Sequence, residues 1–258
     1  MAEGGAIMKN YKMLIRYDGT RYDGWQKQGN TDRTIQGKLE NVLSKLCGCD
    51  IEVHGSGRTD AGVHAWGQVA NAHMDTDLSA DEIRDYLNQY LPADISVETV
   101  KLAPHRFHSR LNAAEKTYRY RIYTGKTKPV FERAYVWSVN ETLSVPAMRQ
   151  ASEFFIGEHD FRSFCANKRM KKSTVRHIYD LTVDQIDEEI QITVTGNGFL
   201  HHMVRIMVGT LYEIGTGKRR PEDIPTILAA MDRQAAGITA PAQGLCLLQV
   251  VYEESFEK

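Results

Sequence analysis

An arginine, a hydroxyl and a carboxylate stand side by side in a glycine-framed segment of this 258-residue chain. The run Arg58-Thr59-Asp60 lies between glycines at 55, 57 and 62 and follows an apolar segment, Ile51–Val53. Glycine permits a positive φ and lets backbone approach a ligand closely. A carboxylate on such a loop can serve as a nucleophile or base. The residues leave open a plainer alternative, in which Asp60 caps the turn and pairs with Arg58.

The loop differs from two common phosphate-binding patterns. It lacks the Gly-Lys-Ser/Thr ending of a P-loop. In the dinucleotide-binding pattern, Asp60 would stand where the third glycine is required. The segment therefore argues against a dinucleotide site.

An arginine interrupts the apolar helix predicted at His201–Ile214. Arg205 stands among Met203, Val204, Ile206, Met207 and Val208. A buried unpaired charge costs several kcal/mol, on the order of 3–5, so this arginine requires a carboxylate. Asp60 or another acid of an active site would meet that need and would favour the ionised form of the acid. Two alternatives remain: Arg205 extends to solvent, or it pairs with Glu213.

Hydrophobic periodicity, caps and turn residues predict alternating strands and helices. Hairpins interrupted by single helices favour an α+β fold with a largely antiparallel sheet, and the second half echoes the order of the first. Predicted strands are Tyr11–Tyr17, Ile51–Val53, Gly67–Met74, Ile95–Leu102, Lys116–Tyr123, Val175–Val183, Ile190–Thr195 and Gly244–Tyr252. Four predicted helices are 35–46, Val145–Ile156, His201–Ile214 and Pro221–Met231. A further helix is predicted from a capping box at Ser79 and Glu82, and its apolar face consists of Ile83, Tyr86, Leu87 and Tyr90.

Composition is that of a globular protein, with 42% hydrophobic and 25% charged residues and a formal net charge of −1. No apolar run approaches the roughly 20 residues that span a bilayer, so we expect a cytoplasmic protein with no membrane partner. Residues 1–8 are expected to be a disordered leader without signal-peptide features. The near-neutral net charge argues weakly against a nucleic-acid partner. Basic residues cluster along the chain, however, so a protein with this net charge can still have a basic face.

Several motifs together resemble the TruA family of tRNA pseudouridine synthases. The segment from Gly55 to Ala65, GSGRTDAGVHA, is the most specific of them. The resemblance extends over roughly residues 9 to 252, with the motifs in the family's order. The other matching segments are 17–20, 24–28, 34–40, 107–110, 116–120, 159–164, 174–176, 196–200, 203–205 and 244–247.

The resemblance implies a fold, a reaction and partners. The fold is that of pseudouridine synthases, with two similar α/β halves of ferredoxin or RRM-like type around a mainly antiparallel sheet and a central cleft. The expected division is 9–108, carrying the aspartate loop, and 109–258. The reaction isomerises uridine to pseudouridine in the anticodon stem–loop of tRNA without metal or other cofactor, on a base flipped out of its stack. The family works as a homodimer.

The resemblance also implies roles for individual residues. Asp60 would be the catalytic aspartate, and Arg58 would fill the space that the flipped base leaves. Tyr118 would stack on the uracil or help remove its C5 proton, and Arg205 would pair with Asp60. Leu247 would pack against the base. Without the resemblance, Tyr118 is equally well explained as a core residue, and an apolar residue such as Leu247 in a closing strand is usually part of the core.

Backbone contacts to tRNA require exposed lysines and arginines. A run of charges such as residues 168–172 is more often a solvated loop. A tRNA substrate would make a phosphate-binding role the better explanation of this run. The predicted phosphate-binding cations are Arg21, Lys27, Arg106, Arg110, Lys168, Arg169, Lys171 and Lys172.

Three rival functions compete with this interpretation. A tRNA-binding protein without catalysis is disfavoured because an acid in a phosphate-binding cleft is repelled. A metal-dependent hydrolase would use histidines, but adjacent residues on a helix point about 100° apart, which disfavours a shared ion at His201-His202. A redox protein would use Cys47 and Cys49, whose spacing is too short for a redox turn. The five histidines considered for the hydrolase are His54, His64, His73, His201 and His202.

Overall fold

A computed structural model describes residues 8–167 and 169–253. Its contacts divide the chain into two compact units. Unit 1 contains the chain up to Ala114 together with the chain from Leu247, and unit 2 runs from Glu115 to Cys246. The division therefore falls six residues beyond the expected position, and the end of the chain returns to the first unit. The expected leader lies outside the described residues except for Met8, as does Lys168.

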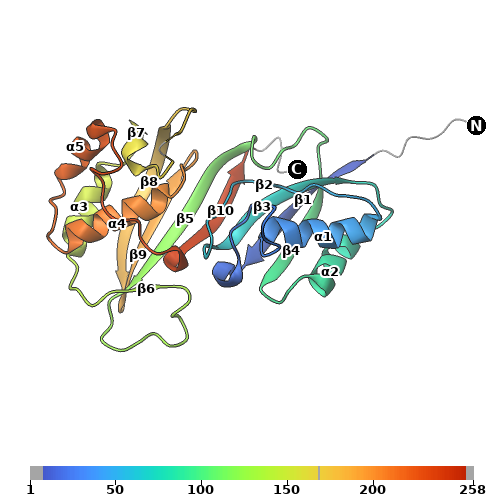
Figure 1. The fold of residues 1–258 in the computed structure, drawn as a ribbon, viewed down its shortest axis with the longest axis horizontal. Helices are drawn as coiled ribbons and strands as arrows, with labels where there is room; N and C mark the ends of the chain where they lie inside the picture. Colours follow the sequence, from blue (N-terminus) through green and yellow to red (C-terminus); the bar gives the residue numbers. More distant parts are fainter. Residues whose placement is uncertain (1–7, 168, 254–258) are drawn as a thin grey trace, which may run out of the picture. The chain divides into compact units, whose positions relative to one another are not determined.

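Unit 1 is a sheet covered on one face by two helices (Figure 1). Strands β4, β1, β3 and β10 lie in this order, and β2 pairs with β3. Both neighbours of β1 run antiparallel to it. The bounds are β1 Lys9–Tyr17, α1 Ile35–Cys47, β2 His54–Gly55, β3 His64–Met74, α2 Ala80–Tyr90, β4 Ile95–Ala103 and β10 Leu245–Tyr252.

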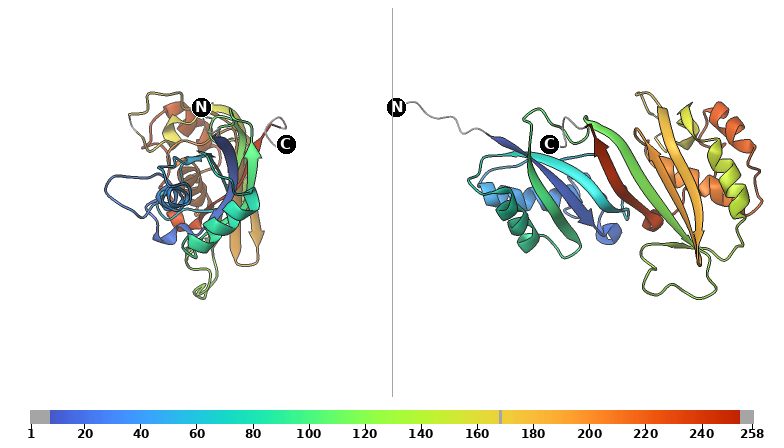
Figure 2. Two further views of the ribbon diagram at one scale, coloured as in Figure 1. Left: turned by 90° about the vertical axis from the view of Figure 1, so that its right-hand side faces the viewer. Right: turned by 180° about the vertical axis from the view of Figure 1, so that it is seen from behind.

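The two-residue alternation of β1 builds the core of unit 1. Tyr11, Met13 and Ile15 are buried, because they point toward α1 and α2. Lys12 and Leu14 lie on the opposite face and are only half-buried. Figure 2 shows this second face from behind, and no helix within residues 8–167 and 169–253 covers it. One face of the sheet therefore holds the core, and the other remains accessible.

Caps define both helices of unit 1. The Thr34 hydroxyl accepts from the Gly37 amide at the start of α1, and Gly48 ends this helix with a left-handed φ of 68°. The capping box of Ser79 and Glu82 is present at the start of α2, as predicted. The predicted apolar face of α2 is only partly buried, because Tyr90 is 56% exposed. This last residue of the helix extends beyond the edge of the core.

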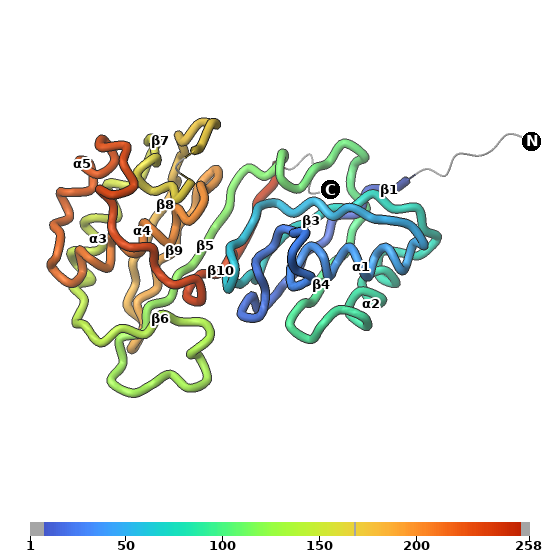
Figure 3. Tube along the Cα trace, in the orientation of Figure 1, coloured from blue at the N-terminus to red at the C-terminus, as the bar shows by residue number. Residues whose placement is uncertain are grey.

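Unit 2 repeats the plan of a sheet with helices. Strands β5, β9, β8 and β7 lie in this order, and neighbouring strands are antiparallel. The short β6 pairs with β5 in parallel, after a wide excursion of the chain (Figure 3). The bounds are β5 Ala113–Tyr123, β6 Trp137–Ser138, α3 Val145–Glu153, β7 Gly157–Asp160, β8 Val175–Ile186, β9 Glu189–Gly196, α4 Met203–Gly215 and α5 Asp223–Ala230.

The predicted hairpin of unit 2 is present with a shorter turn than expected. Strands β8 and β9 pair as far as Ile186 and Glu189, and Asp187 adopts a positive φ of 52° in the turn. On β5, Tyr118, Tyr120 and Ile122 are buried together, as their alternation predicted. The α+β class and the mainly antiparallel pairing are thus confirmed.

One predicted strand is wrong. Residues 51–53 have no strand pairing, and the ladder begins only at His54. Side chains of α1 take the place of a partner strand. The Val53 amide donates to Oε1 of Glu40, and the Val53 carbonyl accepts from Nε2 of Gln36. Polar residues on the buried side of a helix therefore satisfy this backbone.

Candidate active site

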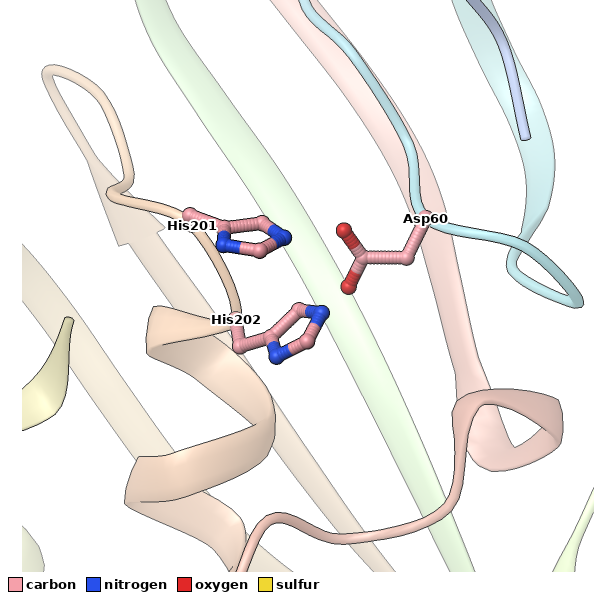
Figure 4. A group of neighbouring side chains, drawn as sticks. All are labelled: Asp60, His201 and His202. Carbon is pink, nitrogen blue, oxygen red and sulfur yellow. The ribbon is translucent and has the colours of Figure 1, made fainter. Parts of the chain in front are cut away.

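Asp60 lies on the connection from β2 to β3 and is half-buried (Figure 4). The connection reverses at Gly62, whose φ of 78° is left-handed. The amide of Val63 donates to the carbonyl of Asp60 at 3.1 Å, which closes the turn. Glycine is needed at this position because other residues rarely adopt such a φ. The turn therefore presents a carboxylate at a fixed point of the backbone.

A second segment of unit 1 packs against the Asp60 turn. The Trp25 amide donates to the Thr59 carbonyl at 3.1 Å, and the Gly62 amide donates to the Tyr22 carbonyl at 3.3 Å. Gly24 has a φ of 99°, and a Cβ placed on it would lie 2.7 Å from the Thr59 carbonyl oxygen. The two segments can approach this closely only because residue 24 has no side chain.

Asp94 holds the segment that supports the Asp60 turn. The Tyr22 hydroxyl donates to Oδ1 of Asp94, and the Arg21 guanidinium donates twice to Oδ2. Burial, and next the bond to Asp94, raise the pKa of Tyr22, so this hydroxyl remains a donor. The Asp18 amide also bonds to the Asp94 carbonyl at 3.0 Å. Asp94 therefore anchors the segment through both side-chain oxygens and its backbone.

Arg58 is exposed, and its side chain bonds to a residue outside the Asp60 turn. Its Nε donates to Oε1 of Gln26 at 3.0 Å. Gln26 in turn donates to Gln36 on α1. Arg58 thus has a partner other than Asp60, which weakens the plain interpretation of a capped turn closed by an Asp60–Arg58 pair.

The substrate-binding residues predicted outside the loop fall in both units. Tyr118 is buried on β5 and meets the edge of Phe199 with ring centroids 5.2 Å apart. Arg205 is half-buried in the first turn of α4, where its Nε donates to the Ala240 carbonyl at 2.8 Å. The alternative partner of Arg205, Glu213, binds Arg219. Leu247 is fully buried on β10.

The predicted helix at His201 begins two residues later than expected. Helix α4 starts at Met203, and His202 precedes it with a left-handed φ of 60°. The imidazole rings of His201 and His202 therefore lie side by side, with centroids 3.9 Å apart (Figure 4). The geometric objection to a shared ion, which assumed a helix at both residues, was wrong.

The cations predicted to bind phosphate in unit 1 fall into two kinds. Arg21 and Lys27 are paired with carboxylates, since Lys27 lies 2.8 Å from Glu40 and Arg21 lies 2.5 Å from Asp94. Arg106 and Arg110 are exposed, and neither forms an ion pair within the described part of the chain. The second pair is therefore better suited to bind phosphate.

The predicted cations of unit 2 form an exposed basic segment, Arg169–Lys172. Arg169, Lys171 and Lys172 are all exposed. The hydrogen bonds nearby are local, such as that from the Arg169 amide to Oδ1 of Asn167. The remaining member of the predicted set, Lys168, lies outside the described residues.

The local structure disfavours a reactive thiol at Cys47. Cys47 is the last residue of α1 and forms no disulfide within the described residues. Burial is the main cause that raises the pKa of the Cys47 thiol. A raised pKa lowers the fraction of thiolate, which is the reactive form.

In the described residues, no helix has the length and apolar content needed to cross a bilayer.

Comparison with known proteins decides between the remaining interpretations. The family model described as tRNA pseudouridine synthase matches residues 13–112 and 151–253. A tRNA pseudouridine synthase A from Bacillus sp. (strain KSM-64) is 50% identical over 240 residues, which is 93% of this chain and 98% of the relative. The chain belongs to the tRNA pseudouridine synthase family. As a member of this family it is an isomerase.

Two further comparisons describe how similar the chain is to other members. A tRNA pseudouridine synthase A 2 from Bacillus anthracis is 47% identical over 245 residues, covering 95% of this chain and 100% of the relative. Among solved structures, a chain of a Cbf5–Nop10–Gar1 complex matches with a TM-score of 0.39 and 11% identity, covering 93% of this chain and 50% of that one. That structural likeness is too low to support an argument about the site.

Sequence reasoning missed the residues that hold the synthase loop in place. Asp94 is one of them, and Gln68 on β3 is another. Gln68 stands between Gly67 and Val69 and is fully buried. A buried polar side chain requires hydrogen-bond partners, so polar residues within an apolar strand were the available signal.

Proposed function

We propose that this synthase isomerises uridine to pseudouridine in the anticodon stem–loop of tRNA, with Asp60 as the catalytic carboxylate. The observation that carries the proposal is the fixed presentation of Asp60. Its turn is bonded to Tyr22 and Trp25, and Gly24 packs on its backbone. A reaction is faster when the surrounding structure already holds the catalytic group in its reactive position before the substrate binds.

The reaction is an isomerisation, so uridine and pseudouridine have the same elemental composition. The bond between N1 of uracil and C1′ of ribose breaks, the base turns, and a bond forms between C5 and C1′. The proton on C5 then leaves, and N1 gains one. Asp60 can take part either by attacking C1′ or by accepting a proton. The oxidation state of the nucleoside does not change, so the chemistry requires no redox partner.

A stacked base must leave its stack before Asp60 can reach its sugar. Such flipping costs a few kcal/mol, on the order of 2–4. Arg58 is suited to occupy the vacated place, because it is exposed two residues before Asp60. Tyr118 is proposed to contact the flipped uracil, Arg205 to pair with Asp60, and Leu247 to pack against the base.

The tRNA backbone is proposed to lie on the exposed cations that have no ion pair among the described residues. Arg106 and Arg110 serve in unit 1, and Arg169, Lys171 and Lys172 serve in unit 2. Such contacts release counterions, so affinity is expected to fall steeply with salt. A salt-independent affinity would contradict this assignment. A tRNA substrate also implies that the protein acts in the cytoplasm.

Self-association is proposed from the helix-free face of the unit 1 sheet. Trp66 is 61% exposed and Leu102 is 60% exposed. Together with Leu14 and Leu248 they line one groove on this face. Apolar residues gathered in this way favour a protein contact, and a second copy of the chain is the proposed occupant. Sedimentation equilibrium tests this, since a monomer at micromolar concentration would contradict it.

The catalytic proposal is tested by tritium release from tRNA whose uridines are labelled at C5. The wild type, Asp60→Asn and Asp60→Ala are assayed with and without EDTA, and tRNA binding is measured in parallel. We expect release by the wild type and a loss of about 10⁴-fold or more in both variants, with the Kd for tRNA largely kept. The amide variant controls for size because it keeps the shape of the aspartate.

The other outcomes separate the rival functions. Release by the variants at the wild-type rate would assign the catalytic carboxylate to another residue. Binding without release by any protein would favour a tRNA-binding protein. Loss of release only in EDTA would favour a role for a metal, for which His201 and His202 would be the first residues to test.

A further inference from the structure

We infer that Gln68 is a positioning residue, which fixes the Asp60 turn through a directed chain of hydrogen bonds. The inference rests on the proposed catalytic role of Asp60. Gln68 lies on β3 and is fully buried. Its side-chain amide contacts three separate points around the residues that lead to Asp60.

The amide oxygen of Gln68 holds Ser56, the first residue in this series of hydrogen bonds. The Ser56 hydroxyl donates to Oε1 of Gln68 at 2.6 Å. Ser56 is itself fully buried, and its amide donates to the Val69 carbonyl at 2.7 Å. Side chain and backbone of Ser56 are thus both bound to β3.

The amide nitrogen of Gln68 contacts two further groups, the Gly57 carbonyl and the Tyr17 hydroxyl. Nε2 donates to the Gly57 carbonyl at 3.0 Å and lies 3.4 Å from the Tyr17 hydroxyl oxygen. Because Nε2 can only donate, the Tyr17 oxygen must accept. The Tyr17 hydroxyl hydrogen is then available to Oγ1 of Thr59, which lies 2.8 Å away.

The direction of these bonds explains why a glutamine is required. An amide offers an acceptor on one side and two donors on the other. A carboxylate in its place would set an oxygen against the Gly57 carbonyl. It would also reverse the bond to Tyr17, whose hydroxyl would then donate to the carboxylate and no longer to Thr59. The bonds end at Thr59, the residue directly before Asp60, so a change at Gln68 alters the support of the carboxylate without touching it.

The test compares Gln68→Glu with a matched control on the same strand. Asn71 is also fully buried, but its amide bonds to Asn10 and Ser109 and not to the turn. Asn71→Asp therefore makes the same chemical change, from amide to acid, away from Asp60. Both variants are measured for unfolding, tRNA affinity, kcat and KM, and the exchange of the turn's backbone amides.

We expect Gln68→Glu to lower kcat by about 10²-fold, the cost of a misplaced catalytic group, with KM and the Kd for tRNA nearly unchanged. Amide exchange at residues 57–61 should accelerate. Lowering the pH should restore part of kcat relative to the wild type, because a protonated carboxyl regains one donor. The control Asn71→Asp should lose stability but keep kcat in the folded fraction and the exchange of the turn.

Tyr17→Phe supplies a milder variant if Gln68→Glu does not fold. It removes only the hydroxyl that links Gln68 to Thr59, and a fall in kcat of about tenfold is expected for the loss of one buried hydrogen bond. A wild-type kcat in either folded variant, or an equal loss of kcat in Asn71→Asp, would overturn the inference. The exchange measurement involves no turnover. It therefore tests the support of the turn even if Asp60→Asn were found to be active.

Discussion

The Asp60 turn of unit 1 and the basic segment Arg169–Lys172 of unit 2 are both polar connections between elements of a sheet. Buried side chains and backbone from several elements hold the Asp60 turn, including Tyr17, Trp25 and Gln68. The cations of the basic segment are exposed, and the hydrogen bonds of Arg169 and Met170 go to the neighbouring Asn167.

This difference in support corresponds to two different functions, catalysis by a carboxylate and phosphate binding by cations. A carboxylate that attacks a sugar carbon or moves a proton must be placed to within a fraction of an ångström, and rigid support achieves this. A cation that meets a phosphate acts mainly through long-range attraction, which tolerates freedom of the side chain. Substitutions in the turn should therefore change kcat, and substitutions in the basic segment should change affinity.

The largest effect in the turn, apart from Asp60 itself, is expected from Gly24→Ala. The new methyl group would lie 2.7 Å from the Thr59 carbonyl oxygen at a φ of 99°, so the turn must shift. We expect kcat to fall by about 10²-fold while the Kd for tRNA changes little. Single-turnover kinetics and a binding titration measure the two quantities.

Two glycines of unit 1 serve as matched controls for Gly24→Ala. Gly29 has nothing within 4 Å of the new methyl position, and Gly48 has a positive φ of 68° with open space around it. Gly29→Ala should be neutral, and Gly48→Ala should lower stability without changing kcat. An equal loss of kcat in Gly48→Ala would mean that backbone strain in general, and not the shift of the turn, causes the effect.

The basic segment should show the opposite pattern. Replacing Arg169, Lys171 and Lys172 by alanine together should weaken tRNA binding by about tenfold or more at physiological salt. The slope of log affinity against log salt should become shallower by about 2 to 3, since each phosphate contact contributes roughly 0.7 to 0.9. The kcat at saturating tRNA should remain that of the wild type.

A second loop of unit 2 supplies a control with the same change of charge. Lys126, Lys128 and Arg133 are exposed on the excursion between β5 and β6. Alanine at these three positions should leave the salt slope closer to that of the wild type. Equal slopes in both triple variants would show that net charge, and not the position of the cations, determines affinity.

The same two regions show which features a single sequence can predict. The ends of α1 were predictable because Thr34 and Gly48 act within one turn of the helix. The position of Asp60 on a glycine-framed turn was predictable for the same local reason. The support of that turn was not, because Gln68 and Tyr17 reach it through tertiary contacts between strands.

The two wrong expectations have the same physical origin. Residues 51–53 alternate like a strand, yet side chains of α1 satisfy their backbone. His201 and His202 directly precede the apolar run of α4, yet the chain turns at His202 before the helix begins. Periodicity reports which side chains are buried, but it does not report which partner satisfies the backbone.

The smallest effect is expected from a comparison of two exposed arginines of unit 1. Arg21 is bound to Asp94, whereas Arg106 has no ion pair in the residues that the structure describes. Arg106→Ala should weaken tRNA binding by about three- to tenfold and lower the salt slope by roughly 1, as for one lost phosphate contact.

Arg21→Ala should change affinity less, because the carboxylate of Asp94 already neutralises this guanidinium and holds it in place. Its loss should instead loosen the segment beside the Asp60 turn. We therefore expect a change of about twofold or less in Kd, and any larger effect in kcat. Titrations at several salt concentrations measure this. An Arg21→Ala variant that lowers the salt slope as much as Arg106→Ala would show that tRNA displaces Asp94 from Arg21, and the cation would then join the phosphate-binding set.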